Sequence, residues 1–140
     1  MPFLDLLPQT PGLLPKWQLF VSTVALYNTV QCFCTSKLTR RVYNNAPVVT
    51  DLQVRTFGVW TITSAVVRFY AAYHITEKAV YDLALFTYLI AFGHFSSELL
   101  IFRTAKINPG IMSTFVFASL SLVWMLVQYD YYVGPPAYTP

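Results

Sequence analysis

Charged residues are scarce in this chain of 140 residues. Asp, Glu, Lys and Arg together make up 11% of it, whereas a soluble globular domain has about 25%. Hydrophobic residues make up 56%, and the mean hydropathy is +0.50. The composition therefore predicts a membrane protein. The net charge is only +3, and no basic run is interleaved with aromatic residues, which argues against binding to nucleic acid.

Cysteine, histidine and glycine are too few for several classes of site. Two cysteines, Cys32 and Cys34, match neither a disulfide framework nor a complete zinc site, and we interpret them as packing residues, with reversible acylation as an alternative. Two histidines cannot supply the large ligand set of a membrane di-iron oxygenase, and five glycines form no nucleotide-binding fingerprint. We therefore expect no metal and no cofactor.

Four apolar segments are long enough to cross a bilayer, because a spanning helix needs about 20 mostly apolar residues. They occupy residues 17–36, 52–73, 79–102 and 111–128. The sequence thus predicts an all-α membrane protein, a bundle of four transmembrane helices in one domain of residues 1–140. Residues 1–15 are rich in proline and are expected at the membrane interface, and residues 129–140 form a tail rich in Tyr and Pro.

The connections between the spans predict their directions. Residues 74–78 form a very short turn, so the second and third helices should make an antiparallel hairpin. The composition of the longer connection at 37–51 predicts a solvated loop. Cations gather in the first and third loops, at Lys37, Arg40, Arg41, Arg103 and Lys106. This bias places both loops on the cytosolic side and both termini on the other.

Ionisable residues lie inside two of the predicted spans, where each costs about 2.5–3.5 kcal/mol near the helix centre. In an antiparallel hairpin Arg55 is level with Glu98, which predicts one ion pair. Arg68 is level with Asp82, which predicts a second. The 13 positions between the two arginines turn them to different sides of their helix. One of these groups, or His94, is therefore expected to face another helix, a second copy or a partner protein.

His94 and Glu98 are four residues apart and share a helical face. An imidazole beside a carboxylate suits general acid–base catalysis or metal ligation. Structural pairing is the alternative interpretation of the same two residues.

Small residues recur at four-residue spacing on two spans, which lets membrane helices approach closely. Gly93 and Ser97 lie on the third span, and Gly110, Thr114 and Ala118 run into the fourth. These faces are interpreted either as packing within the bundle or as docking surfaces for another subunit.

Three stretches carry a family resemblance. Residues 52–61 (LQVRTFGVWT), 67–70 (VRFY) and 94–104 (HFSSELLIFRT) closely resemble the ergosterol biosynthetic protein 28 family, and the chain looks like a fungal member. The similarity extends to LPKW at 14–17 and SLVWM at 121–125. It covers about four fifths of the chain.

The resemblance implies a four-helix protein of the endoplasmic reticulum membrane, multi-pass and without catalytic activity. Such a protein would tether the enzymes that remove sterol C-4 methyl groups. These partners are a sterol C-4 methyl oxidase, a C-4 decarboxylating 3β-hydroxysteroid dehydrogenase and a 3-ketosteroid reductase. We also expect a homodimer and contact with membrane lipid, with sterol as one candidate ligand.

The ionisable residues of the spans and of the third loop are predicted to fix the hairpin or a partner-docking surface. They are Arg55, Arg68, Asp82, His94, Glu98 and Arg103. The rival hypothesis is a membrane enzyme, such as a sterol isomerase in which His94 and Glu98 exchange protons beneath a roof of Phe92 and Phe95. A third hypothesis is a helix bundle that binds or transports a lipid such as sterol.

Overall fold

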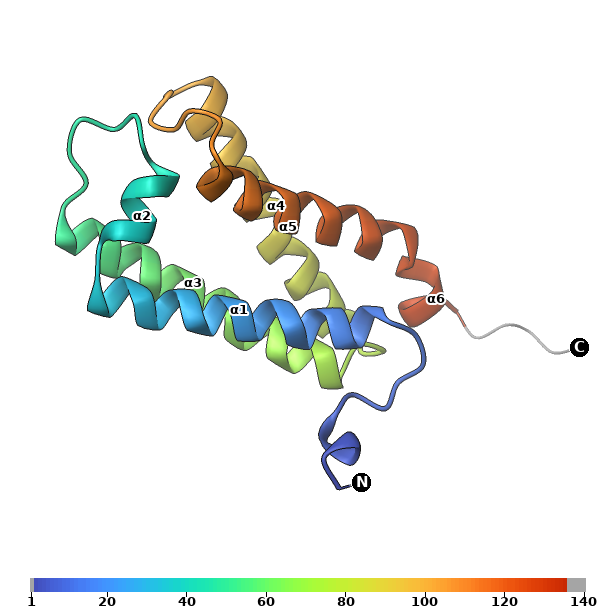
Figure 1. The fold of residues 1–140 in the computed structure, drawn as a ribbon. Helices are drawn as coiled ribbons and strands as arrows, with labels where there is room; N and C mark the ends of the chain where they lie inside the picture. Colours follow the sequence, from blue (N-terminus) through green and yellow to red (C-terminus); the bar gives the residue numbers. More distant parts are fainter. Residues whose placement is uncertain (1, 136–140) are drawn as a thin grey trace, which may run out of the picture.

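The computed structural model describes residues 2–135, and over that range it contains helices and no strands (Figure 1). Four helices are long: α1 (Leu14–Cys34), α3 (Asp51–Tyr73), α4 (Lys78–Leu100) and α5 (Pro109–Val127). Three are short: η1 (Leu4–Leu6), α2 (Lys37–Val42) and α6 (Tyr129–Val133). The predicted all-α class is confirmed, and each long helix begins and ends within three residues of its predicted span.

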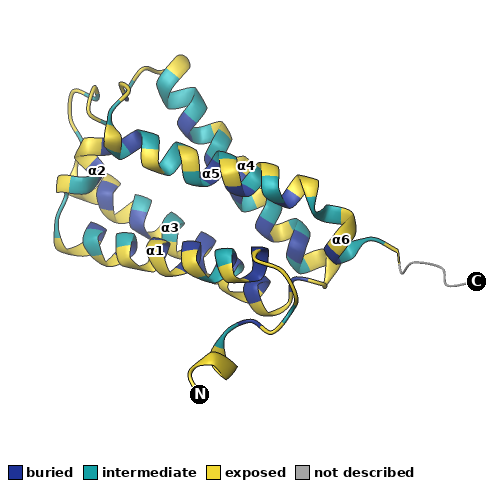
Figure 2. Cartoon of the chain, turned by 45° about the vertical axis from the view of Figure 1, so that its right-hand side comes forward, coloured by how far each residue is buried: buried dark blue, intermediate teal, exposed yellow. Residues whose placement is uncertain are grey.

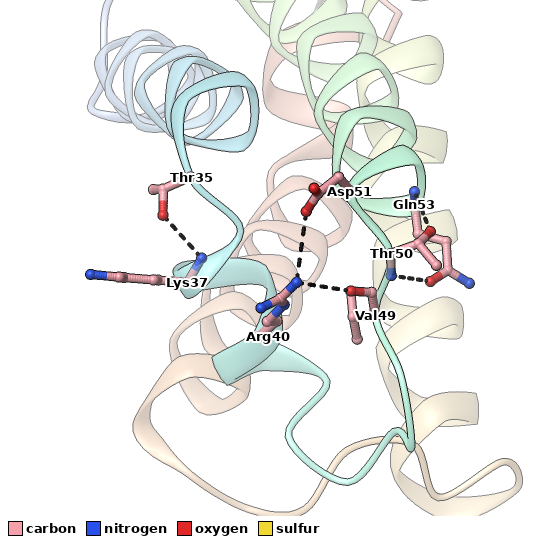
Figure 3. Close-up of polar contacts among 7 residues, drawn as sticks. All are labelled: Thr35, Lys37, Arg40, Val49, Thr50, Asp51 and Gln53. Carbon is pink, nitrogen blue, oxygen red and sulfur yellow. Dashed lines mark hydrogen bonds and ion pairs between the residues drawn. The ribbon is translucent and has the colours of Figure 1, made fainter.

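Local sequence signals fix the ends of the long helices. At the start of α3, the Thr50 hydroxyl accepts a hydrogen bond from the Gln53 amide at 3.2 Å, and the Gln53 side chain accepts one from the Thr50 amide at 2.8 Å (Figure 3). This capping box pairs two amides that the helix itself leaves free. At the start of α5, Asn108 caps the helix and Pro109 takes its first turn, where the missing amide costs nothing.

The first connection is partly helical, which differs from the solvated loop that its composition predicts. Thr39 and Val42 on α2 are buried, so this short helix packs down onto the bundle. Arg40 then ties it to the start of α3, through an ion pair with Asp51 at 3.7 Å and a hydrogen bond to the Val49 carbonyl at 3.4 Å (Figure 3).

The four long helices form two close pairs, α1 with α3 and α4 with α5 (Figure 1). Gly58 explains the first pair, because a Cβ at this position would lie 2.9 Å from the Cβ of Cys32 on α1. The Thr29 hydroxyl of α1 also reaches the Gly58 carbonyl at 3.3 Å. The chain reverses between α3 and α4 as predicted, but these two helices contact each other less than each contacts its own partner.

Two helices within residues 2–135, α4 and α5, are long and apolar enough to cross a membrane, with mean hydropathies of 1.4 and 2.0. Only 22% of the most apolar window of each is buried, and residues of intermediate or full exposure run along both helices (Figure 2). Such surfaces fit a membrane protein. The polar residues of α1 and the arginines of α3 keep these helices below the same threshold, so a bundle of four spans stays a prediction.

Residues 4–13 and helix α6 are anchored at the end of the bundle opposite α2 (Figure 1). The Tyr73 hydroxyl donates to the Leu6 carbonyl at 2.7 Å, and the Tyr132 hydroxyl donates to the Pro11 carbonyl at 3.1 Å. Residues 129–133 of the predicted tail form helix α6, in which Tyr132 is buried. The rings of Tyr129 and Tyr132 pack on the Tyr81 ring, with centroids 5.3 and 6.2 Å from it. The rest of that tail, 136–140, lies outside the described residues.

Candidate functional site

Two loops meet at the α2 end of the bundle and are joined by hydrogen bonds. We call residues 35–50 the first loop and residues 101–108 the third loop. Asn45 donates to the carbonyls of Thr104 and Arg103 through its amide and side chain, at 3.0 and 2.6 Å. Asn44 accepts from the Lys106 amide at 2.8 Å, and Asn108 donates to the Arg41 carbonyl at 3.0 Å. These asparagines fix the position of the first loop over the end of α4.

Tyr43 carries the first loop into the space between α3 and α4. Its hydroxyl lies 2.6 Å from Nε2 of His94. The imidazole also packs against Trp60 of α3 and Phe95 of α4, with ring centroids 5.2 and 5.1 Å apart, and Phe57 meets the Tyr43 ring edge-on at 5.8 Å. His94 is thus held inside an aromatic cage built from three elements.

Glu98 continues this arrangement one turn along α4. Its Oε1 lies 3.9 Å from Nδ1 of His94, and its other oxygen accepts a hydrogen bond from the Thr104 hydroxyl. Burial, followed by the nearby Glu98 carboxylate, raises the pKa of the Tyr43 hydroxyl above its ordinary value, so Tyr43 stays protonated. An imidazole that accepts at Nε2 carries its proton on Nδ1, toward Glu98. We call these four residues the Tyr43–Thr104 chain.

A pocket of about 300 Å³ lies beside the Tyr43–Thr104 chain. Val48, Val49 and Phe57 supply apolar parts of its wall, and the side chains of His94 and Glu98, 33% and 17% exposed, supply polar parts. Its volume is at the lower end of the range for small-molecule sites. The arrangement links two loops through four groups, and a proton transfer from Nε2 to a ligand would first require Tyr43 to move away.

The predicted ion pair between Arg55 and Glu98 is wrong. Arg55 is exposed on α3, while Glu98 is bound to Thr104 and faces His94. Equal depth along the two helices was the basis of the prediction. Two side chains meet only if they are level along their helices and also point toward each other. Helix α3 packs on α1 rather than along α4, so Arg55 does not point toward Glu98.

The predicted ion pair between Arg68 and Asp82 is also wrong. Asp82 instead accepts from the Lys78 ammonium and from the Tyr129 hydroxyl, each at 2.6 Å. Arg68 is buried, and its Nε donates to the Thr87 hydroxyl at 3.1 Å. Its guanidinium carbon lies 4.1 Å from the centroid of the Tyr88 ring, a cation–π contact.

Arg103 occupies a turn that leaves its side chain exposed. Its φ is +55°, in the left-handed region that a residue with a Cβ rarely adopts. The turn holds because the Arg103 carbonyl accepts the short hydrogen bond from Asn45. The guanidinium therefore projects from a fixed backbone position.

The small residues lie in different surroundings. Gly93 is exposed, and among residues 2–135 a Cβ there would meet nothing within 4 Å, so this position makes no close helix contact in the described part of the chain. The Ser97 hydroxyl donates to the His94 carbonyl of its own helix. A Cβ at Gly110 would lie 3.3 Å from the Arg41 carbonyl, so the start of α5 does pack closely on α2. Thr114 and Ala118 line a cleft between the helix pairs.

The remaining members of the site could not be picked out from the sequence. Asn44, Asn45 and Asn108 are recognisable as turn residues, but their partners in the other loop are not. Tyr43 is one of ten tyrosines, and no spacing sets it apart. The roof proposed over His94 is also partly different, because Phe92 packs on Phe115 of α5 at 5.4 Å and Trp60 takes its place.

Asn108 offers a direct test of how far the loop contacts stabilise the fold. Asn108→Ala removes the cap of α5 and the bond to Arg41, and we expect it to lower the free energy of unfolding by about 2 kcal/mol. Asn108→Ser keeps a capping hydroxyl but cannot bridge to Arg41, so it should lose about 1 kcal/mol. Denaturant unfolding of the purified protein in nonionic detergent, followed by circular dichroism, measures both. Equal losses for the two variants would show that the capping hydroxyl adds nothing and that the whole loss comes from the bridge to Arg41.

The family model described as "Erg28 like protein" matches residues 14–123. Ergosterol biosynthetic protein 28 of Schizosaccharomyces pombe is 52% identical over 125 residues, 89% of this chain and 90% of that protein. The Saccharomyces cerevisiae protein of the same name is 46% identical, over 88% of this chain and 84% of its own length.

The similarity extends beyond fungi. The human ergosterol biosynthetic protein 28 homolog is 40% identical over 122 residues, 86% of this chain and 87% of that protein. No solved structure matches the chain. The matched region includes α1, α3, α4 and both loops of the site, together with α5 up to residue 123. The chain therefore belongs to the ergosterol biosynthetic protein 28 family, whose members' names place it in sterol biosynthesis.

Proposed function

We propose that this protein is a non-catalytic scaffold of the endoplasmic reticulum membrane, with α1, α3, α4 and α5 as its four spans. It tethers the sterol C-4 methyl oxidase, the decarboxylating 3β-hydroxysteroid dehydrogenase and the 3-ketosteroid reductase, and it pairs with a second copy of itself. Holding enzymes on one scaffold raises the effective concentration of each product for the next enzyme.

The observation that carries the proposal is the Tyr43–Thr104 chain. His94 and Glu98 are the side chains best suited to acid–base chemistry, yet both are engaged by other protein groups that lock two loops together. Within residues 2–135, moreover, no three His, Cys, Asp or Glu side chains lie close enough to hold a metal ion. The polar groups of the site thus support a fixed surface.

The outer surface supplies room for partners. Leu83, Phe86 and Ile90 on α4 are each more than half exposed, and Gly93 on the same helix leaves open space beside them. Small residues next to apolar ones allow another membrane helix to approach closely. Arg103 adds an exposed cation on a rigid turn at the predicted cytosolic end.

Arg103→Glu tests whether that end is used for docking. We expect the variant, expressed as a tagged chain in microsomes, to recover several-fold less of at least one of the three enzymes, because the substitution reverses a charge at the rim of the docking surface. The fold should be unaffected, since the exposed Arg103 side chain makes no hydrogen bond or ion pair with residues 2–135. Immunoprecipitation with quantitative mass spectrometry measures the recovery. Lys16→Glu is the matched control, an exposed cation at the opposite end, and should recover all three. A parent chain that recovers none of the three enzymes would contradict the scaffold.

The pocket beside His94 and Glu98 favours one second candidate, a sterol isomerase. The purified chain, given sterol intermediates without partner enzymes, decides between the two. The scaffold predicts no turnover. Turnover that is lost in both His94→Gln and Glu98→Gln, with the unfolding transition unchanged, would establish the enzyme instead.

A further inference from the structure

A second cleft, of about 120 Å³, lies in the middle of the bundle between the two helix pairs. All four long helices line it, through Val21 and Val24 of α1, Trp60 of α3, Ala91 of α4 and Phe117 of α5 among others. Its wall is mostly apolar, and one charged side chain, Arg68, reaches it. Along α3 the lining runs from Phe57 to Arg68, about 16 Å at 1.5 Å per residue.

Arg68 is only partly satisfied by the protein. It is 8% exposed, and of its nitrogens only Nε has a hydrogen-bond partner among residues 2–135, the Thr87 hydroxyl. In the same part of the chain no carboxylate lies within 4 Å of it. A guanidinium has five N–H donors, and a buried charge without a counter-charge is costly. The two terminal nitrogens of Arg68 therefore have no hydrogen-bond acceptor among residues 2–135.

The end of the cleft near Arg68 is rigid. Tyr88 lies under the guanidinium and donates to Gln18 at 2.7 Å. Trp17 stacks on Phe117 with ring centroids 5.6 Å apart and donates to the Ser121 hydroxyl at 2.8 Å. The position of the charge is thus fixed by contacts that come from four helices.

We propose that this cleft binds an apolar lipid that carries a single carboxylate. The carboxylate accepts from the terminal nitrogens of Arg68, a planar pairing that matches guanidinium geometry, and the apolar body lies along the cleft. The volume is smaller than the 300–1,000 Å³ or so of a site that encloses a whole drug-sized ligand. It holds the head and the adjoining part of the lipid, and the remainder extends into the bilayer.

The test uses the full chain in nonionic detergent and four probes. Oleic acid represents a straight-chain carboxylate and lithocholic acid a polycyclic one, and the methyl ester of each is its neutral control. Equilibrium binding of each probe, used in radiolabelled form, measures its affinity directly. We expect at least one acid to bind about tenfold or more tightly than its ester, and the acid that binds identifies the lipid skeleton.

Variants assign the preference to Arg68. Arg68→Gln should abolish the difference between acid and ester, whereas Arg55→Gln, which changes an exposed arginine of the same helix, should retain it. Val24→Trp fills the mouth of the cleft from a position already 38% exposed. It should block binding of the acid with Arg68 intact, so it decides the matter if Arg68→Gln does not fold.

Equal binding of acid and ester by the parent chain would overturn the proposal. So would an unchanged preference in folded Arg68→Gln, or unchanged binding of the acid in Val24→Trp. These results bear on the cleft alone. Recovery of the three enzymes in immunoprecipitation does not depend on lipid in the cleft, so failure here leaves the scaffold proposal standing.

Discussion

Gly58→Val should lower the free energy of unfolding by about 3 kcal/mol or prevent the chain from folding. The reason lies in the closest contact between α1 and α3, where even the first carbon of a side chain at position 58 would lie 2.9 Å from the Cβ of Cys32 and 3.4 Å from the Phe33 ring. Neither Cβ can move without its helix. Thermal or denaturant unfolding of the purified variant in detergent measures the loss.

Gly93→Val is the matched control for Gly58→Val. It makes the same change in the middle of a long helix, at a glycine where an added Cβ meets nothing within 4 Å. We expect stability within about 0.5 kcal/mol of the parent, as for other surface substitutions. If Gly58→Val unfolds no more readily than this control, the close pairing of α1 with α3 is incorrect. The control has a second use, since reduced self-association in Gly93→Val alone would place this face at the contact between copies.

Tyr43→Ala should destabilise the protein by about 2 kcal/mol, and it should also weaken recovery of partner enzymes. Removing the ring leaves a cavity between α3 and α4 and takes away the only hydrogen-bond partner of His94 Nε2 among residues 2–135. Full burial of an aromatic ring would cost about 3–5 kcal/mol, and Tyr43 is intermediate in exposure. Unfolding in detergent and immunoprecipitation from microsomes provide the two measurements.

Tyr43→Phe separates the hydroxyl from the ring. It keeps the ring packing against Phe57 and His94 but removes the hydroxyl that pairs with Nε2 of His94, so we expect a loss of about 1 kcal/mol and normal recovery of partners. A larger effect of Tyr43→Phe than of Tyr43→Ala would contradict a structural role. It would direct attention to the proton on the tyrosine, as the isomerase hypothesis requires.

The helices themselves were predictable because each has a local cause. A run of about 20 apolar residues defines each long helix, and caps such as Thr50 with Gln53 and Asn108 with Pro109 mark where two of them begin. Helix α2 was missed because its six residues are mostly polar, and only burial of Thr39 and Val42 shows why it is helical.

The pairing of helices could not be read from the sequence in the same way. Distance along the sequence determines how deep Arg55 and Glu98 lie, but not how α3 is rotated about its own axis. The face of α3 that carries Gly58 packs on α1, and Arg55 is left on the surface. Arg68 was correctly singled out as a buried charge in need of partners. Its actual contacts, Thr87 and Tyr88, are a neutral hydroxyl and a ring, types too common along α4 to be picked out by spacing.

The unequal lengths of the long helices bear on the thickness of the bilayer that suits them. At 1.5 Å per residue, the 19 residues of α5 reach about 28 Å, whereas the 23 residues of α3 and of α4 reach about 34 Å. In the four-span arrangement proposed above, a hydrocarbon layer of about 27 Å, as in the endoplasmic reticulum, would match α5 without distortion and require the longer helices to tilt. A plasma membrane of about 32 Å would have to thin around α5. Hydrophobic mismatch at this one helix would thus oppose export to thicker membranes.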